Sequence, residues 1–191
     1  MSPLLLLTLL AADDAADTEK RLAAGEVIIT TDKIEGSDMA RVTAVAVIDA
    51  PPEKVWAIVE DCANYSKNMV RIGESKLISR EGNTFVCEVT ADLPWPVPDL
   101  TSQTRAVHDI EPGVRWQRKW TLLKGDYTRN DGSWTLTHYK GDPNRTLGQY
   151  QLHIEPKIHV PDSLIARGQK KSLPDLFEKL RSLTVPAKPA K

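Results

Sequence analysis

The stretch "DSLIARGQKKSLPDLFEKLRSL", residues 162–183, decides the fold of this chain. Its apolar side chains recur at mostly helical spacing and predict one long amphipathic helix. They are Leu164, Ile165, Leu173, Leu176, Phe177, Leu180 and Leu183. Gly168 and Pro174 both weaken a helix, so we expect a kink or a break at Pro174. The weak point is either a hinge that opens a gate or a boundary between two short helices.

Six consecutive segments before this helix have the pattern of β-strands. They lie in the stretches 71–93, 100–123, 127–139 and 145–156. Hairpin-length turns separate them at "REGN" (80–83), "EPG" (111–113) and "KGDPN" (140–144). Short connections between consecutive strands predict an antiparallel meander.

The first part of the chain adds strands over residues 26–36 and 40–50, and short helices. Gly25 is expected to end a helix that covers "TEKRLAA". Pro51 and Pro52 should stop the second strand, and one of them should open a helix whose residues Val55, Trp56 and Val59 share a face. A further short helix is expected over "CANYSKN". The simplest way to bury every apolar face is one α+β domain, residues 17–184, whose sheet wraps around the long helix.

The two ends of the chain suggest processing and disorder. Leu4–Ala12 is apolar but too short to span a bilayer, which takes about 20 residues. Its length fits the core of a signal peptide, so we expect residues 1–16 to direct export to the periplasm or the medium. The alternative is a frayed helix on a cytoplasmic protein. Residues 185–191 are expected to form a disordered tail.

Charge and cysteine content exclude several classes of function. A net charge of -1 and a pI near 6.4 argue against nucleic-acid binding. The four histidines are scattered, and no metal or cofactor motif is present, so we expect neither a metal nor a cofactor. We also expect a monomer. Export would permit a disulfide between Cys62 and Cys87. We expect instead two small buried thiols, because a core of this size needs no covalent staple.

Strand alternation indicates which side chains face inward. Trp116 and Trp120 share a phase with Arg118, whose charge needs a partner or a role in a pocket. Thr146 and Gly148 are small residues on an inward phase and should leave space. Large aromatic residues on several strands either fill a core or line a hollow. The candidate ligand-binding residues are Phe85, Trp95, Arg105, Trp116, Arg118, Trp120, Trp134, Leu136, Tyr150, Leu173 and Phe177.

The segment "DLPWPVPDL", residues 92–100, places Trp95 between prolines that prevent regular strand pairing. A stiff loop of this kind either covers the core with the ring or holds the ring at the mouth of a cavity.

Several of these stretches together resemble START-like (SRPBCC, polyketide cyclase / coenzyme Q-binding) domains. The likeness rests on "AVIDAPPEKVWAIVEDCANYSKNM" (46–69), "SKLISREGN" (75–83), "DLPWPVPD" (92–99) and the last strands and helix, and it spans Gly25–Leu183. It implies a helix-grip fold with an internal cavity for a lipid, sterol, quinone or polyketide. Eukaryotic-type START domains tend to have an Arg-Asp pair after the Pro-Trp-Pro stretch. Here Arg105 comes later, which puts a role for that arginine in doubt.

Three functions are compatible with this reading. The first is binding of a lipid or another apolar small molecule for transport or sequestration, with transient membrane contact. The second is an enzyme, cyclase- or hydrolase-like, acting in the same cavity. His108, or Arg105 with Asp109, are its nearest acid–base candidates. The third is a protein-interaction module, which the near-neutral charge disfavours for ribosomes.

Overall fold

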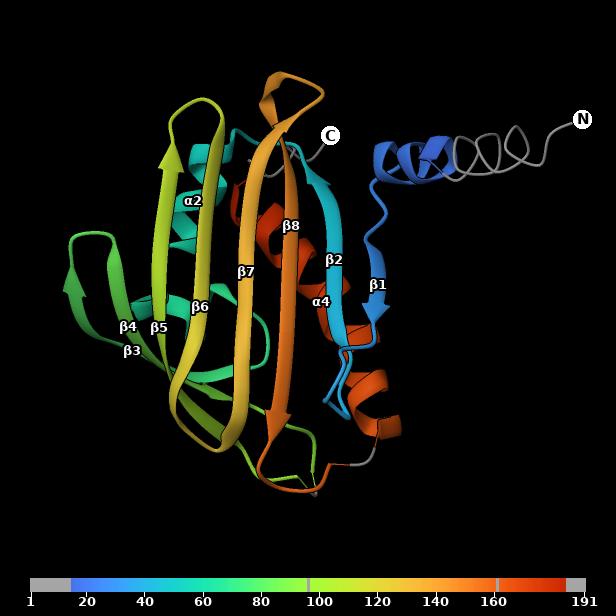
Figure 1. The fold of residues 1–191 in the computed structure, drawn as a ribbon. Helices are drawn as coiled ribbons and strands as arrows, with labels where there is room; N and C mark the ends of the chain where they lie inside the picture. Colours follow the sequence, from blue (N-terminus) through green and yellow to red (C-terminus); the bar gives the residue numbers. More distant parts are fainter. Residues whose placement is uncertain (1–14, 96, 161, 185–191) are drawn as a thin grey trace, which may run out of the picture.

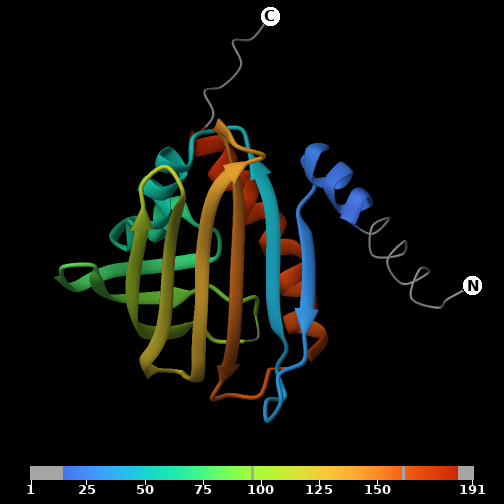
Figure 2. The ribbon, with the colours of Figure 1, turned by 45° about the horizontal axis from the view of Figure 1, so that its top comes forward.

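One antiparallel sheet of eight strands forms the body of the protein (Figures 1 and 2). The structure is a computed structural model that describes residues 15–95, 97–160 and 162–184, with only the backbone of 162–167, 169 and 170. The strand order is β1-β2-β8-β7-β6-β5-β4-β3. The strands are β1 (Ile28–Asp32), β2 (Arg41–Ile48), β3 (Ile72–Glu81), β4 (Thr84–Ala91), β5 (Leu100–Glu111), β6 (Arg115–Gly125), β7 (Tyr127–Tyr139) and β8 (Asp142–Pro156). The six-strand meander β3–β8 is therefore confirmed.

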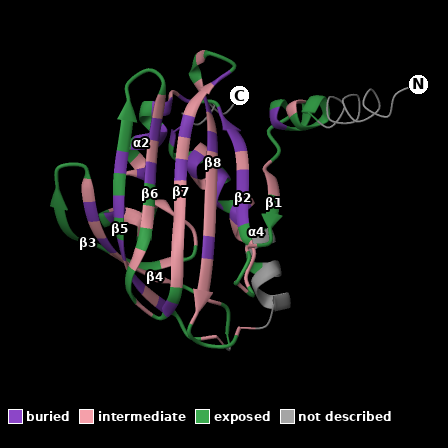
Figure 3. Ribbon diagram, in the orientation of Figure 1, coloured by how far each residue is buried: buried purple, intermediate pink, exposed green. Residues whose placement is uncertain are grey.

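The long helix α4 (Asp162–Thr184) lies across one face of the curved sheet, as both views show (Figures 1 and 2). Phe177 and Leu180 are fully buried and pack in one core cluster with Trp116 and Leu136. Figure 3 shows buried positions along the central strands of the sheet. This arrangement is the helix-grip fold that the resemblance implied.

Gly148 does not leave open space, contrary to expectation. A Cβ atom at this position would lie 3.2 Å from Cε1 of Phe177, so the missing side chain lets α4 approach the sheet closely. Thr146 is also fully buried, and its hydroxyl donates a hydrogen bond of 2.6 Å to the carbonyl of Ala50. The helix and a loop occupy the space that these small residues create.

A kink or a break was expected at Pro174, and the break is wrong, because α4 continues through this residue. A proline inside a helix costs about 3 kcal/mol. The neighbouring residues Leu173, Leu176 and Phe177 are buried, and each such side chain contributes about 1.5–3 kcal/mol. Packing against the sheet therefore outweighs the lost hydrogen bond. The side chains of Leu164 and Ile165, also expected to be apolar contacts, lie outside the described part of the chain.

The turn between β7 and β8 is tighter than the expected "KGDPN" turn. Only Lys140 and Gly141 lie between the strands, and both have positive φ, 53° and 77°. Two consecutive positive φ values are typical of a type I′ turn, whose twist matches that of a hairpin. Pro143 therefore lies at the start of β8, outside the stretch that pairs with β2.

Short helices cover the top of the α4 side of the sheet (Figure 1). They are α2 (Pro52–Val59), the 3-10 turn η1 (Cys62–Asn64) and α3 (Tyr65–Asn68). Pro52 stands at the first position of α2, as expected. Residues 15–23 form another helix, and its end carries the two hydrogen bonds of a Schellman cap, Gly25 N–H to Leu22 and Glu26 N–H to Arg21. The predicted end at Gly25 is confirmed.

The two cysteines form a disulfide, contrary to the expected pair of free thiols. The turn η1 carries Cys62 over β4, and the Cα atoms of Cys62 and Cys87 are 6.3 Å apart. This separation lies within the range that a disulfide spans. The bond ties the helical segment after α2 to the sheet and has both sulfur atoms buried.

The expected signal peptide at residues 1–16 lies mostly, and the expected tail at 185–191 wholly, outside the described residues. No helix in the described ranges is long and apolar enough to cross a membrane.

Candidate functional site

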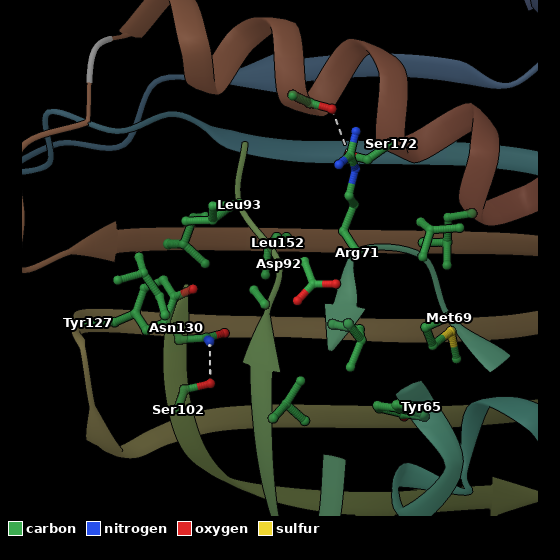
Figure 4. Close-up of a pocket in the computed structure, with 18 of the residues that line it drawn as sticks. Tyr65, Met69, Arg71, Asp92, Leu93, Ser102, Tyr127, Asn130, Leu152 and Ser172 are labelled. Atoms are coloured by element: carbon green, nitrogen blue, oxygen red, sulfur yellow. Dashed lines mark hydrogen bonds between the residues drawn. The ribbon is translucent and has the colours of Figure 1, made fainter. Parts of the chain in front are cut away.

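A cavity of about 660 Å³ lies between the sheet and α4 (Figure 4). Its walls are mostly apolar and come from strands β2 to β8 and from α3 and α4. Leu152 and Val42 contribute from paired positions on β8 and β2, and Leu173 and Leu176 contribute from the helix. Cavities that hold small molecules in proteins have volumes of roughly 300–1,000 Å³. The space is therefore large enough for a sizeable apolar ligand.

The Trp120 ring covers part of the cavity wall because β7 has a glycine opposite it. A Cβ atom on Gly132 would lie 2.2 Å from Cζ2 of Trp120, so only glycine leaves room for the ring. The indole N–H of Trp120 donates to Oδ1 of Asn130 at 3.1 Å. Asn130 in turn donates to the hydroxyl of Ser102 at 3.1 Å (Figure 4). This short polar chain fixes the ring orientation inside an apolar wall.

The mouth of the cavity lies at the end of the sheet where β4 leads into the proline-rich loop. Trp95 projects from this loop and is 91% exposed. Three exposed charged residues, Arg71, Asp92 and Lys171, also line the cavity here. Figure 4 shows Arg71 pointing toward α4 near Ser172, with Asp92 beside it. Among the residues that the structure describes, the mouth therefore combines an exposed aromatic ring with two cations and one anion.

Arg118 lies deep in the wall and is only 3% exposed. Its guanidinium donates to Nε2 of His108 at 2.6 Å and to Sγ of Cys87 at 3.3 Å. It also lies 5.8 Å from the ring centre of Tyr65. We call these four residues, Tyr65, Cys87, His108 and Arg118, the arginine cluster.

His108 is a neutral partner of Arg118 at ordinary pH. Burial, with the nearby charges of Arg118 and Arg80, lowers the pKa of His108 to about 4. Its ring stacks on Phe85 at 4.0 Å and meets Trp56 edge-on at 4.9 Å. A neutral imidazole accepts the guanidinium hydrogen bond through Nε2, which places its own proton on Nδ1.

The tyrosines in the cavity wall are protonated. Burial raises the pKa of Tyr127 to about 12 and also raises the pKa of Tyr150 and of Tyr65. The Tyr65 hydroxyl donates to the carbonyl of Val59. Within the described residues, no group of three or more His, Cys, Asp or Glu residues could hold a metal ion.

The structure brings six of the eleven candidate residues together at the cavity: Trp95, Arg118, Trp120, Trp134, Tyr150 and Leu173. Their role in ligand binding stays a prediction. The other five do not line it. Trp116, Leu136 and Phe177 are packed in the core. Phe85 packs beside His108, and Arg105 is exposed on the outer face of β5. Asp109, the proposed partner of Arg105, is also exposed.

Several lining residues were not among the candidates. Ser102 and Thr104 share the inward phase of His108 on β5, and Asn130 shares that of Trp134 on β7. Extending the alternation along each strand would have found them. Tyr65 and Met69 come from α3 and the residue after it. Nothing in the sequence around that short helix indicates which of its side chains reach the cavity.

A curved antiparallel sheet that grips one long helix, with an apolar cavity between them, defines a class of proteins built to enclose a small molecule. Residues 48–181 of the chain match the family described as polyketide cyclase / dehydrase and lipid transport. The chain belongs to this family. No curated protein sequence matches the chain significantly.

Solved structures share the fold at low sequence identity. A STAR-related lipid transfer protein from Xanthomonas axonopodis is 19% identical, with a TM-score of 0.68 over 82% of this chain and 92% of its own. Human StAR-related lipid transfer protein 5 is 9% identical, with a TM-score of 0.69 over 94% of this chain and 95% of its own. The Zhui aromatase/cyclase from a Streptomyces species is 17% identical, with a TM-score of 0.60 over 76% and 93%. START domains and a cyclase thus share this architecture.

Proposed function

We propose that the protein binds a lipid or another apolar small molecule in the cavity between the sheet and α4, and transports or sequesters it. The observation that carries the proposal is the cavity itself, about 660 Å³ in volume and mostly apolar. An apolar hollow of this size exposes hydrophobic surface that a ligand would cover. The family description includes lipid transport, and two structural neighbours are named as lipid transfer proteins.

The mouth of the cavity supports a route for the ligand. We propose that Trp95 makes transient contact with a membrane while a ligand enters or leaves. A nearly fully exposed tryptophan is unusual on a soluble surface, and its ring favours the boundary between headgroups and acyl chains. We also propose that the protein acts as a monomer after export. The Cys62–Cys87 disulfide supports export, since such bonds persist in oxidising compartments.

Filling the cavity from one strand tests the binding proposal. Val89 lines the cavity on β4, whereas Val107 is exposed on the outer face of neighbouring β5. We expect Val89→Trp to abolish binding of a fluorescent apolar probe, and Val107→Trp to leave it intact. Equal binding by both variants would overturn the proposal. Recovery of a chemically changed ligand from the wild type would favour the cyclase-like alternative instead.

A further inference from the structure

Arg118 is a buried charge without a carboxylate partner. Its two side-chain hydrogen bonds go to His108 and Cys87, and neither acceptor carries a negative charge. None of the ion pairs within the described residues includes Arg118. Burying an unpaired charge in a protein interior is unfavourable. The arrangement therefore lacks one negative group.

A ligand in the cavity can supply the missing negative group. Arg118 lines the same space as Trp120 and Trp134, its neighbours along and across the sheet. Gly125 ends β6 at the mouth end of the sheet. Arg118 lies seven residues before it, roughly 20 Å along the strand from the mouth. An elongated molecule entering at the mouth would reach Arg118 with its leading end.

The charges around the cavity favour an anion. Arg71 and Lys171 are cationic and Asp92 is anionic at the mouth, so with Arg118 the lining residues that the structure describes carry an excess of two positive charges. The whole chain, by contrast, has a net charge of -1. A cavity with an excess of one sign and low-dielectric walls concentrates the field on ligands of the other sign.

We propose that Arg118 binds the carboxylate of a long-chain acid whose apolar chain lies along the cavity toward the mouth. This inference rests on the proposed function and names the class of ligand. Among the described lining residues Arg118 is the one charged residue that is buried, whereas the charges at the mouth are exposed to solvent, so a single carboxylate balances the buried charge. A phosphate monoester would bring about two negative charges and leave one uncompensated. A neutral alcohol of the same length would leave Arg118 unpaired.

The arginine cluster holds the guanidinium ready for such a group. Hydrogen bonds to His108 and to Cys87 fix its orientation, and the disulfide holds the Cys87 sulfur in place. An arginine presents five donors in a planar fork, so donors remain for a carboxylate after these two contacts. Pre-orientation by neutral acceptors leaves the positive charge available to the ligand.

The test compares three probes of equal chain length on the full-length protein: hexadecanoic acid, hexadecanol and hexadecyl phosphate. Binding is measured by displacement of a neutral apolar probe at pH 8. We expect the acid to bind about 10- to 100-fold tighter than the alcohol, the range expected for a charge-assisted hydrogen bond. The acid should also bind tighter than the phosphate.

Variants at Arg118 assign that preference to its side chain. Arg118→Met should remove the preference for the acid while retaining the alcohol, whereas Arg118→Lys should keep part of it. Arg105→Met, on the outer face of the neighbouring strand, is the matched control and should behave as the wild type. If Arg118→Met does not fold, the comparison of the three probes in the wild type and in Arg118→Lys still shows whether Arg118 binds the carboxylate.

The outcomes separate this inference from the proposed function. Equal binding of acid and alcohol by the wild type, or an acid preference that survives in Arg118→Met, overturns the role of Arg118 and leaves the apolar cavity standing. Tighter binding of the phosphate overturns the carboxylate assignment. Failure of every probe, including the neutral one, overturns both the inference and the proposed function.

Discussion

Removing the Cys62–Cys87 disulfide should strongly destabilise the protein. The two cysteines are 25 residues apart in the sequence. Closing a loop of this length restricts the unfolded chain, and the chain-entropy relation gives a stabilisation of about 3.5 kcal/mol. For a domain of this size, 1 kcal/mol corresponds to about 2–4 °C in Tm. The variant Cys62→Ser/Cys87→Ser should therefore melt about 7–14 °C below the wild type.

The assay is urea unfolding and calorimetry of the wild type and the double variant, each with and without a phosphine reductant. Both sulfur atoms are buried, so the native protein should resist reduction until it unfolds. Once the wild type unfolds, the reductant should cleave the disulfide, so its free energy of unfolding should fall to that of the double variant. The double variant itself provides the control, because reductant should not change its stability.

Two results would refute this reasoning. One is equal unfolding free energy for the wild type and the double variant. The other is titration of two free thiols per chain in denaturant without reductant, which would mean that the bond does not form in the isolated protein.

Three further predictions concern single residues. The pKa of His108 is lowered to about 4 in the folded protein, below the ordinary 6.5. Between these two pH values the unfolded state binds a proton that the folded state does not. The free energy of unfolding should therefore fall as pH drops from 6.5, by about 3 kcal/mol at pH 4. Urea unfolding across this pH range should show the loss, and an unchanged slope in His108→Gln would contradict it. Trp95→Ala should weaken binding to lipid vesicles about tenfold. Val114→Ala, at an exposed position at the other end of the sheet, should leave vesicle binding unchanged. Equal loss of vesicle binding in the two variants would contradict the proposed membrane contact of Trp95. Gly132→Ala should cost about 1–3 kcal/mol in unfolding free energy, because its Cβ would overlap Trp120, and a thermal shift of zero would refute this.

The architecture was predictable because two periodicities are clear in the sequence. Alternation along the strands and the helical spacing around Phe177 correctly assigned the sheet, the long helix and most of their inward residues, although Leu183 is exposed. The alternation also placed Arg118 inward, next to the cavity that the structure shows. These patterns arise from the backbone geometry of strands and helices, which residues close together in the sequence determine.

The errors arose where tertiary packing outweighs local preference. Pro174 remains inside a helix because its neighbours are buried against the sheet. Gly148 marks a close approach of Phe177 rather than free space. The disulfide depends on the distance between η1 and β4, and no local pattern around Cys62 reports that distance. The same applies to the arginine cluster, whose members come from α3, β4, β5 and β6.

Native mass spectrometry after incubation with a lipid extract tests the central claim most directly. We expect one bound lipid per chain for the wild type and for Val107→Trp, whose substitution lies outside the cavity. For Val89→Trp, whose substitution fills the cavity, we expect the mass of the bare chain. A wild type that carries no lipid, or a Val89→Trp variant that carries as much as the wild type, would contradict it.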